Sequence, residues 1–336
     1  MPASLSTSNS KTKFLKRSLL LLALIIVLDQ TVGLVMHKLY FSSTSGAEFE
    51  TTYAFTKADA DVIITGSSKA RRNYNTPLIS DSLQLSCYNA GHDGQSLLFS
   101  YAMTKMLLSH HTPKMIVVEM FPEELYYKEV HYDRLNVLLP YYADYPEVRE
   151  VADWRGTRNE DTTSVFYKLM PFNMEKIKLL SQSYRYNSMW LDLLKGIFKK
   201  QKTESGYLPL NNTITETEKQ QYINEFELTK LRERNRHIDP NKLKSLIGII
   251  KLCEQKNIKV VLVMSPVLKR YGNDPVYQLI DSVALNHQIS FFDFTNDVRF
   301  NNPVYFADNH LNKTGSTVFS SLLAQKLKIV LATNYK

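Results

Sequence analysis

The sequence predicts an α/β fold in which helices cover both faces of a central, mostly parallel sheet of five strands. Short apolar runs rich in β-branched residues recur along the chain, each of the length of a buried strand. Segments with helical spacing of apolar residues separate these runs, and strands that alternate with helices indicate a parallel, doubly covered sheet. We therefore expect a three-layer α/β/α architecture. The predicted strands are residues 61–66, 85–88, 115–120, 258–264 and 289–292.

Helices are expected between and after these strands. One should follow Thr76-Pro77, because proline is favoured at the first position of a helix. The other predicted helices are residues 96–109, a segment that starts near 241 and has apolar residues at helical spacing up to Leu252, 275–287 and 316–330. The folded domain should span 59–336.

The N-terminal part of the chain has the pattern of a membrane anchor. Four positive charges within residues 1–17 precede an apolar run from Ser18 to Leu28, and a second, less pure run reaches Tyr40. The two runs together cover the ~20 residues that span a bilayer. We expect a basic tail at 1–17, an uncleaved transmembrane signal anchor at 18–40 and a polar linker at 41–58. The charge pattern predicts a cytoplasmic N-terminus and a folded domain on the other side of the membrane.

A carboxylate interrupts the apolar stretch. Because a charge inside a membrane is costly and often marks a functional contact, Asp29-Gln30 suggests contact with a partner membrane protein. The alternative is a tilted helix or a protonated Asp29 with no such role.

Composition excludes several classes of protein. The chain has 336 residues, with 44% hydrophobic and 22% charged residues, so wholesale disorder is excluded. Its net charge is +8, but beyond the N-terminal tail the positive charge is spread out, which disfavours nucleic-acid binding. Two cysteines support neither a disulfide framework nor a metal site.

The segment 125–240 lacks the regular alternation. It holds predicted helices at 173–183 and 188–199 and a predicted loop at 202–217. A stretch of this length is too long for an ordinary connection, so we expect an inserted helical cap.

The chemistry of the chain is predicted at the strand ends. Gly66-Ser67-Ser68 follows the first strand, and a turn through Arg71 and Asn73 comes next. A serine there would lie at the carboxyl edge of the sheet, where ligands bind in open α/β folds. Such a serine is a candidate nucleophile if a base reaches it, and otherwise an ordinary turn residue.

Two further segments supply partners for this serine. Asn89 to Gly94 forms a turn after the second strand, and Asp308 and His310 precede the last helix. Together with Gly66-Ser67-Ser68 and the ending His310-Leu311-Asn312-Lys313-Thr314-Gly315, they make the chain resemble the SGNH (GDSL-like) hydrolase superfamily. It is most similar to the membrane-anchored bacterial branch related to envelope acyl-transfer proteins. The resemblance runs from about residue 61 to the C-terminus and is weakest across 125–240.

This resemblance implies a serine esterase or O-acyltransferase with an SGNH/flavodoxin-like fold. Ser68 would be the nucleophile, His310 the base and Asp308 its orienting carboxylate, while the backbone amides of Ser68 and Gly94, chosen over Gly91, would form the oxyanion hole. The implied substrate is a cell-envelope or exported polysaccharide, the implied partner a membrane acyltransferase, and the implied location the bacterial inner membrane. The mechanism requires no cofactor.

Some points of the resemblance remain open. The family's asparagine after the third strand is absent from Glu119 to Glu124, and Asp308 lies two residues before His310 instead of three. His92 or Asn73 could replace the missing donor. A catalytically inactive accessory or glycan-binding subunit of an acylation complex is therefore the alternative function.

Residues beside the predicted nucleophile and in the second turn are candidates for substrate binding. Lys69, Arg71 and Arg72 could hold an anionic substrate, or could form a solvated basic turn. The candidates for substrate contact are Lys69, Arg71, Asn89 and His92.

Overall fold

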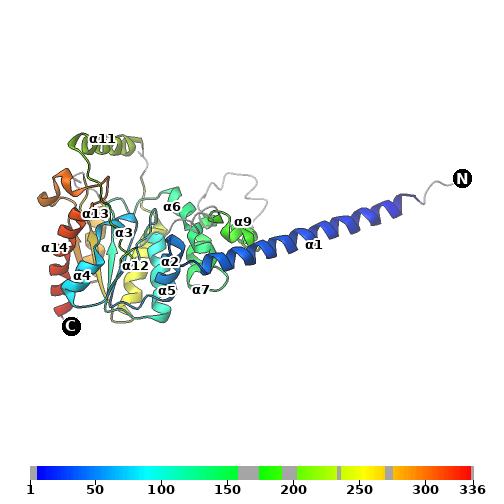
Figure 1. Ribbon diagram of the computed structural model, residues 1–336, viewed down its shortest axis with the longest axis horizontal. Coiled ribbons are helices and arrows are strands. Elements are labelled where there is room, and N and C mark those ends of the chain that lie inside the picture. Colours follow the sequence, from blue (N-terminus) through cyan, green and yellow to red (C-terminus); the bar gives the residue numbers. More distant parts are fainter. Residues whose placement is uncertain (1–5, 158–173, 191–202, 233–235, 269–274, 334–336) are drawn as a thin grey trace.

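The computed structural model describes residues 6–157, 174–190, 203–232, 236–268 and 275–333. Within these residues the sheet has five strands, all parallel, in the order β2-β1-β3-β4-β5. Helices flank it on both sides (Figure 1), so the predicted three-layer α/β/α fold is confirmed. The strands are β1 Val62–Thr65, β2 Cys87–Asn89, β3 Met115–Glu119, β4 Lys259–Met264 and β5 Ser290–Asp293.

Alternate strand residues feed two separate apolar cores. In β1, Ile63 packs into the core formed with α5 (Leu97–His110), α12 (Pro240–Glu254) and α13 (Pro275–Asn286). Its neighbours Val62 and Ile64 pack into the core on the opposite face. That second core is formed with α3 (Ser68–Asn73), α4 (Thr76–Leu83) and α14 (Lys313–Ala332). Because successive side chains of a strand point to opposite faces, continuous apolar strands are required in a sheet covered on both sides.

The predicted linker contains a helix of the folded body. Residues 47–56 form α2 (Ala47–Thr56), which buries Thr51, Ala54 and Phe55. Phe55 is fully buried and stacks on Phe99 of α5, with ring centroids 5.7 Å apart. The segment looks like a linker because it is short, and its threonines favour neither helix nor burial. The packing of Phe55 on α5 determines its structure.

The first helix, α1 (Ser6–Phe41), projects away from the body (Figure 1). Among the described helices it is the one long and apolar enough to span a membrane. Its polar residue Asp29 binds this chain's own segment at 181–183, where both serine hydroxyls and two backbone amides donate to the carboxylate. The Asp29 carboxylate is thus bound within the chain, and contact of Asp29-Gln30 with a partner membrane protein stays a prediction.

The segment between β3 and α12 is built mainly from short helices. The helix predicted at 173–183 is shorter, because α9 covers only Met174–Lys178 and the chain then turns toward Asp29. The helix predicted at 188–199 lies almost entirely outside the described residues. The described helices are α6 Glu129–Asp133, η1 Arg134–Tyr141, α7 Pro146–Asp153, η2 Trp154–Thr157, α9, η3 Ser183–Tyr186 and α11 Glu216–Arg232.

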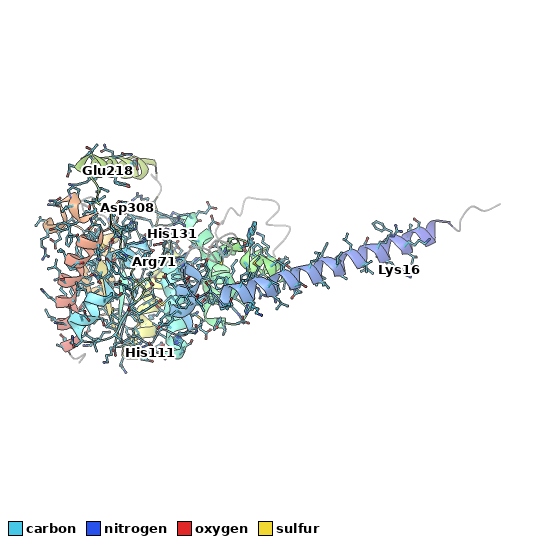
Figure 2. The ribbon with its side chains drawn as sticks, in the orientation of Figure 1. Lys16, Arg71, His111, His131, Glu218 and Asp308 are labelled. Atoms are coloured by element: carbon cyan, nitrogen blue, oxygen red, sulfur yellow. The ribbon has the colours of Figure 1, made fainter. Side chains whose placement is uncertain are left out.

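The helices between β3 and α12 lie in two different parts of the molecule. Residues of η1 and α7 extend the core on the α5 side of the sheet, and η3 packs along α1. By contrast, α11 stands out from the body (Figure 1), at the end of the molecule where Figure 2 places Asp308. Two shorter helices, η4 (Val298–Phe300) and η5 (Pro303–Tyr305), lead into the loop that carries Asp308.

We predict that Phe55→Ala destabilises the folded chain by about 3–5 kcal/mol, because the substitution leaves a cavity under α2. Denaturant unfolding of the full chain in detergent measures this loss. Phe49→Ala is the matched control, since Phe49 lies on the same helix but is only partly buried. Equal, small losses for the two variants would mean that α2 is not part of the cooperative core.

Candidate active site

Ser68 lies at the first position of α3, directly after β1. Gly66 makes this tight passage possible: its φ is +153°, and a Cβ there would lie 2.7 Å from the Cβ of Glu119 on β3. Ser67 caps α3 by accepting a hydrogen bond from the Lys69 amide. The residues predicted as a turn, Arg71 to Asn73, belong to this helix.

Ser68, His310 and Asp308 are joined by hydrogen bonds. The Ser68 Oγ lies 2.7 Å from His310 Nε2, and His310 Nδ1 lies 2.7 Å from Asp308 Oδ1. Since a carboxylate only accepts, Nδ1 carries the proton and Nε2 is free to accept one from the serine. The structure thus brings these three predicted residues together in the arrangement of a nucleophile, a base and an orienting acid.

The short spacing between Asp308 and His310 is accommodated by a tight loop. The Ala307 amide donates to the carbonyl of His310, and Phe306 and Leu311 form an isolated antiparallel bridge. Inside the loop the His310 amide also donates to Asp308 Oδ1, at 2.7 Å. The same oxygen therefore holds both the backbone and the ring of His310.

The motif that follows His310 fixes this loop to α14. Leu311 is fully buried, and Asn312 caps α14 by accepting from the Gly315 amide. The Asn312 amide group also donates to the carbonyl of Val304, at 2.8 Å. A Cβ at Gly315 would lie 2.2 Å from the carbonyl oxygen of Tyr305, so only glycine fits there.

A buried polar chain connects the His310 loop to the sheet. The Leu311 amide donates to Asn73 Oδ1 at 2.9 Å, and Asn73 Nδ2 donates to Ser265 Oγ at 2.8 Å. Ser265, just after β4, donates to Glu119 at the end of β3, and Tyr74 donates to the other oxygen of that carboxylate. Burial raises the pKa of Glu119, against the effect of these hydrogen bonds. Asn73 thus positions the loop. Its side-chain amide already donates to Ser265, so it is not free to replace the missing oxyanion donor.

Lys69 binds the backbone of the loop that carries His310. It is 6% exposed, and its Nζ donates to the carbonyl of Asn309 at 2.6 Å. Its ammonium lies 5.5 Å from the ring centroid of Phe121, and burial lowers its pKa. Lys69 is therefore placed to hold the backbone beside His310, and its contact with substrate stays a prediction.

Arg71 and Asn89 are structural residues for the same reason. Arg71 is 3% exposed and forms ion pairs with Glu50 of α2, at 2.5 Å, and with Asp93, at 3.0 Å. Asn89 is 2% exposed and donates to the carbonyls of Ala70 and Tyr74. The charge of Arg71 and the side-chain amide of Asn89 hold α3 against its neighbours, and contact of either residue with substrate stays a prediction.

The turn after β2 packs against α3 through Gly91. A Cβ at Gly91 would lie 2.7 Å from the Arg71 amide nitrogen, whereas Gly94, with φ +74°, lies against Arg134 of η1. The Asn89 side chain accepts from the Gly91 amide, at 3.0 Å. The assignment of an oxyanion-hole amide to Gly94 stays a prediction.

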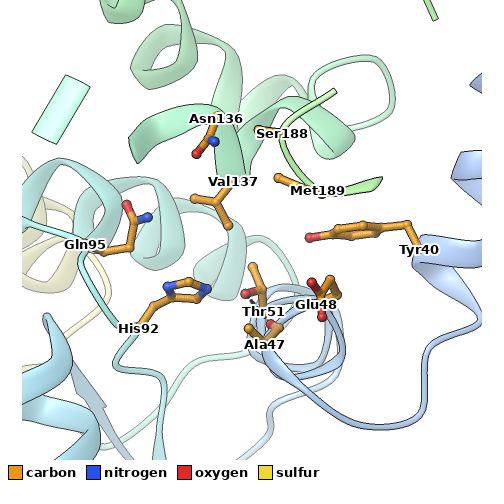
Figure 3. A pocket seen from close by; sticks show the side chains of 10 residues that line it. All are labelled: Tyr40, Ala47, Glu48, Thr51, His92, Gln95, Asn136, Val137, Ser188 and Met189. Carbon is orange, nitrogen blue, oxygen red and sulfur yellow. Dashed lines mark hydrogen bonds between the residues drawn. The ribbon is translucent and has the colours of Figure 1, made fainter. Parts of the chain in front are cut away.

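His92 faces a pocket of about 180 Å³ (Figure 3). Burial lowers its pKa to about 4, so the ring is neutral at pH 7. Its Nδ1 lies 3.1 Å from the carbonyl of Asp93 and must donate, which leaves Nε2 as an acceptor. Ser68 is not among the lining residues, which are Tyr40, Ala47, Glu48, Thr51, His92, Gln95, Asn136, Val137, Ser188 and Met189.

Comparison with known proteins assigns neither a family nor a function to the chain. No family model and no curated protein matches the chain. Among solved structures, it is similar to a Bacteroides fragilis protein described as a "putative acylhydrolase". The two are 13% identical, the match covers 80% of this chain and 87% of that one, and the TM-score is 0.37. A similarity at this level carries no argument about the site, which rests on its own geometry.

We predict that His310 titrates below its ordinary pKa of about 6.5. Burial lowers the pKa, and the Lys69 charge adds to this effect, while Asp308 raises it. Asp308→Asn should lower the pKa of His310 further, because the imidazolium loses its carboxylate partner. NMR titration of the ring measures both shifts. A His310 pKa above 6.5 in the unsubstituted chain would contradict this electrostatic account.

We predict that Asn73→Ala destabilises the chain by about 1–3 kcal/mol, because the buried Leu311 amide loses its acceptor. Denaturant unfolding measures the loss, and Asn301→Ala at an exposed position is the control. The signals of the His310 ring should also broaden or shift in the Asn73 variant. An unchanged ring spectrum would show that Asn73 does not position the loop.

Proposed function

We propose that this chain is a serine esterase or O-acyltransferase of the SGNH type. The observation that carries the proposal is the continuous hydrogen-bonded path from Ser68 through His310 to Asp308, at 2.7 Å for each step. This path lies at the carboxyl edge of the parallel sheet. The order of the strands reverses there, because β2 and β3 lie on opposite sides of β1. The sequence resemblance to the SGNH superfamily supports the same assignment.

In the proposed reaction, Ser68 Oγ attacks the carbonyl carbon of an ester while His310 Nε2 takes the hydroxyl proton. The ester C–O bond then breaks, and the alcohol leaves with the proton returned by His310. The acyl group stays on Ser68 until water or a sugar hydroxyl attacks and takes it away. Asp308 holds the tautomer of the ring throughout and stabilises the imidazolium that forms.

The developing oxyanion requires hydrogen-bond donors. The Ser68 amide, at the first position of α3, has no acceptor within the helix and is available for this role. Gly94 is the second proposed donor, and each such donor contributes about 3–4 kcal/mol in well-studied hydrolases. The turn after β3 holds no asparagine, and Glu119 at the end of β3 is engaged in the buried polar chain.

We further propose that α1 anchors the protein in the bacterial inner membrane, with the domain outside the cytoplasm. Four positive charges before the apolar run support this orientation. The proposed substrate is an acylated envelope or exported polysaccharide, and the proposed partner is a membrane acyltransferase. Both come from the sequence resemblance.

A non-catalytic accessory or glycan-binding subunit is the second candidate. The observation in its favour is the turn from Phe121 to Glu124, which offers no asparagine. There Glu124 accepts from the Leu97 amide at 2.7 Å, which anchors the start of α5. The turn therefore serves the scaffold, and one oxyanion donor of the family is missing.

Reaction with a fluorophosphonate separates the two candidates. We predict that the full chain in detergent gains one adduct by intact mass, because His310 activates the Ser68 hydroxyl. Ser68→Ala should abolish the adduct, and His310→Ala should slow its formation at least a hundredfold.

Ser67→Ala is the matched control for this experiment. Ser67 is the adjacent hydroxyl and caps α3 without contacting His310, so its loss should leave the adduct in place. If the folded, unsubstituted chain takes no label while a known serine esterase does, the accessory role replaces the esterase proposal. Labelled protein would next be assayed for acetate release from an O-acetylated polysaccharide.

A further inference from the structure

The contact between Asp29 of α1 and the segment 181–183 has a consequence for how the protein sits in a membrane. The apolar run Ser18–Leu28 has 11 residues, which rise about 16 Å as a helix. The hydrocarbon core of a bilayer is about 30 Å thick. The run up to Asp29 is therefore too short to cross it.

A full span must include the second apolar run. Twenty residues from Ser18 reach His37, and the charges on the other side, Lys16 and Arg17, fix the start. Asp29 then lies about 12 Å below His37, within the leaflet on the side of the folded domain. A charge at that depth requires partners, because lipid supplies none.

Those partners come from the chain itself. The hydroxyls of Ser181 and Ser183 donate to Asp29 Oδ1, and the amides of Gln182 and Ser183 donate to its two oxygens, all within 3.2 Å. The approach is close, since a Cβ at Gly33 would lie 2.3 Å from the Cβ of Gln182. The segment must therefore lie at the same depth as Asp29.

From its contact with Asp29 the segment runs along α1 toward the folded body. Tyr186 donates to, or accepts from, His37 Nδ1 at 2.9 Å, and its ring lies 5.9 Å from that of Tyr40. Figure 1 shows α9 beside the body-proximal end of α1. Residues 181–183 contact Asp29, and Tyr186 contacts Tyr40, which is nearer the folded body. Leu180 therefore lies at the end of the segment that is deepest in the membrane.

Two apolar side chains of this segment are exposed, as contact with lipid requires, and Lys178 between them, 47% exposed, pairs with Glu175 at 3.2 Å. Leu180 is 77% exposed and Ile177 46%, and nearby on α1 the side chain of Leu34 is 65% exposed. Trp190 is 46% exposed and follows Met189, which lines the same pocket as Tyr40. Aromatic residues at such a level are typical of the interface between lipid and water.

We infer that residues 177–183 form a foot inserted into the leaflet nearest the folded domain, with Leu180 in contact with lipid acyl chains and Asp29 bound at its tip. This inference is independent of the proposed catalysis. It requires only that α1 spans the bilayer, and it gives the protein a second membrane contact that is not a transmembrane helix.

Depth measurements with nitroxide labels test the inference on the full chain in lipid nanodiscs. Leu180→Cys is the test, Leu24→Cys the reference inside the span, and Leu285→Cys the aqueous reference. Leu285 is 69% exposed, so the test and the aqueous reference are leucines of similar exposure. The native cysteines, Cys87 and Cys253, are buried, and the unsubstituted chain reports any labelling of them.

The difference between relaxation by oxygen and by nickel is expected to have opposite signs at residues 180 and 285. At residues 180 and 24, oxygen should relax the nitroxide more than a water-soluble nickel complex does, and at residue 285 the nickel complex should dominate. Ile177→Cys gives a second reading of the same foot. Nickel dominance at 177 and 180, or shielding of both labels from both reagents, would overturn the inference, while lipid contact at 24 shows that the span itself is intact.

Discussion

The buried polar chain is the constraint on which the site depends. Its members come from the ends of β3 and β4, from α3 and from the loop after His310, and each has its partners inside the protein. A buried network of this kind fixes geometry because any displacement leaves a desolvated polar group without a partner. Through Asn73 it sets the position of the backbone that carries His310. The serine and the histidine are therefore held by the same set of contacts, although they lie 242 residues apart in the sequence.

Much of the fold follows from local sequence pattern, and so does the core of the site. The apolar runs Val62–Ile64 and Val260–Met264 fill both faces of a parallel sheet, which leaves few other structures open to them. The residues predicted as nucleophile, base and acid are close together because parallel strands bring their carboxyl ends to one edge. Asp308 reaches His310 in spite of the shorter spacing, since the tight loop turns its carboxylate back onto the ring.

The rest depends on tertiary contacts that local pattern does not report. Lys69 and Arg71 read as an exposed basic turn, but each is buried against an acceptor from a distant part of the chain, Asn309 and Glu50. Glu119 ends an apolar strand, and a carboxylate in that position was the available signal for the buried polar chain. For α2, the signal was weak because Phe55 becomes informative only once α5 is placed beneath it.

Arg71 also joins α3, which carries Ser68, to the part of the chain that follows α1. It binds Glu50 on α2, and only the five residues 42–46 separate α2 from the end of α1. A long flexible tether would let the folded body move widely relative to α1. This body cannot move in that way, because its first helix after α1 is part of its own core. Ser68 is consequently held at a nearly fixed distance from the end of α1, and in the proposed membrane-anchored esterase this would set the height above the bilayer at which an ester meets the serine.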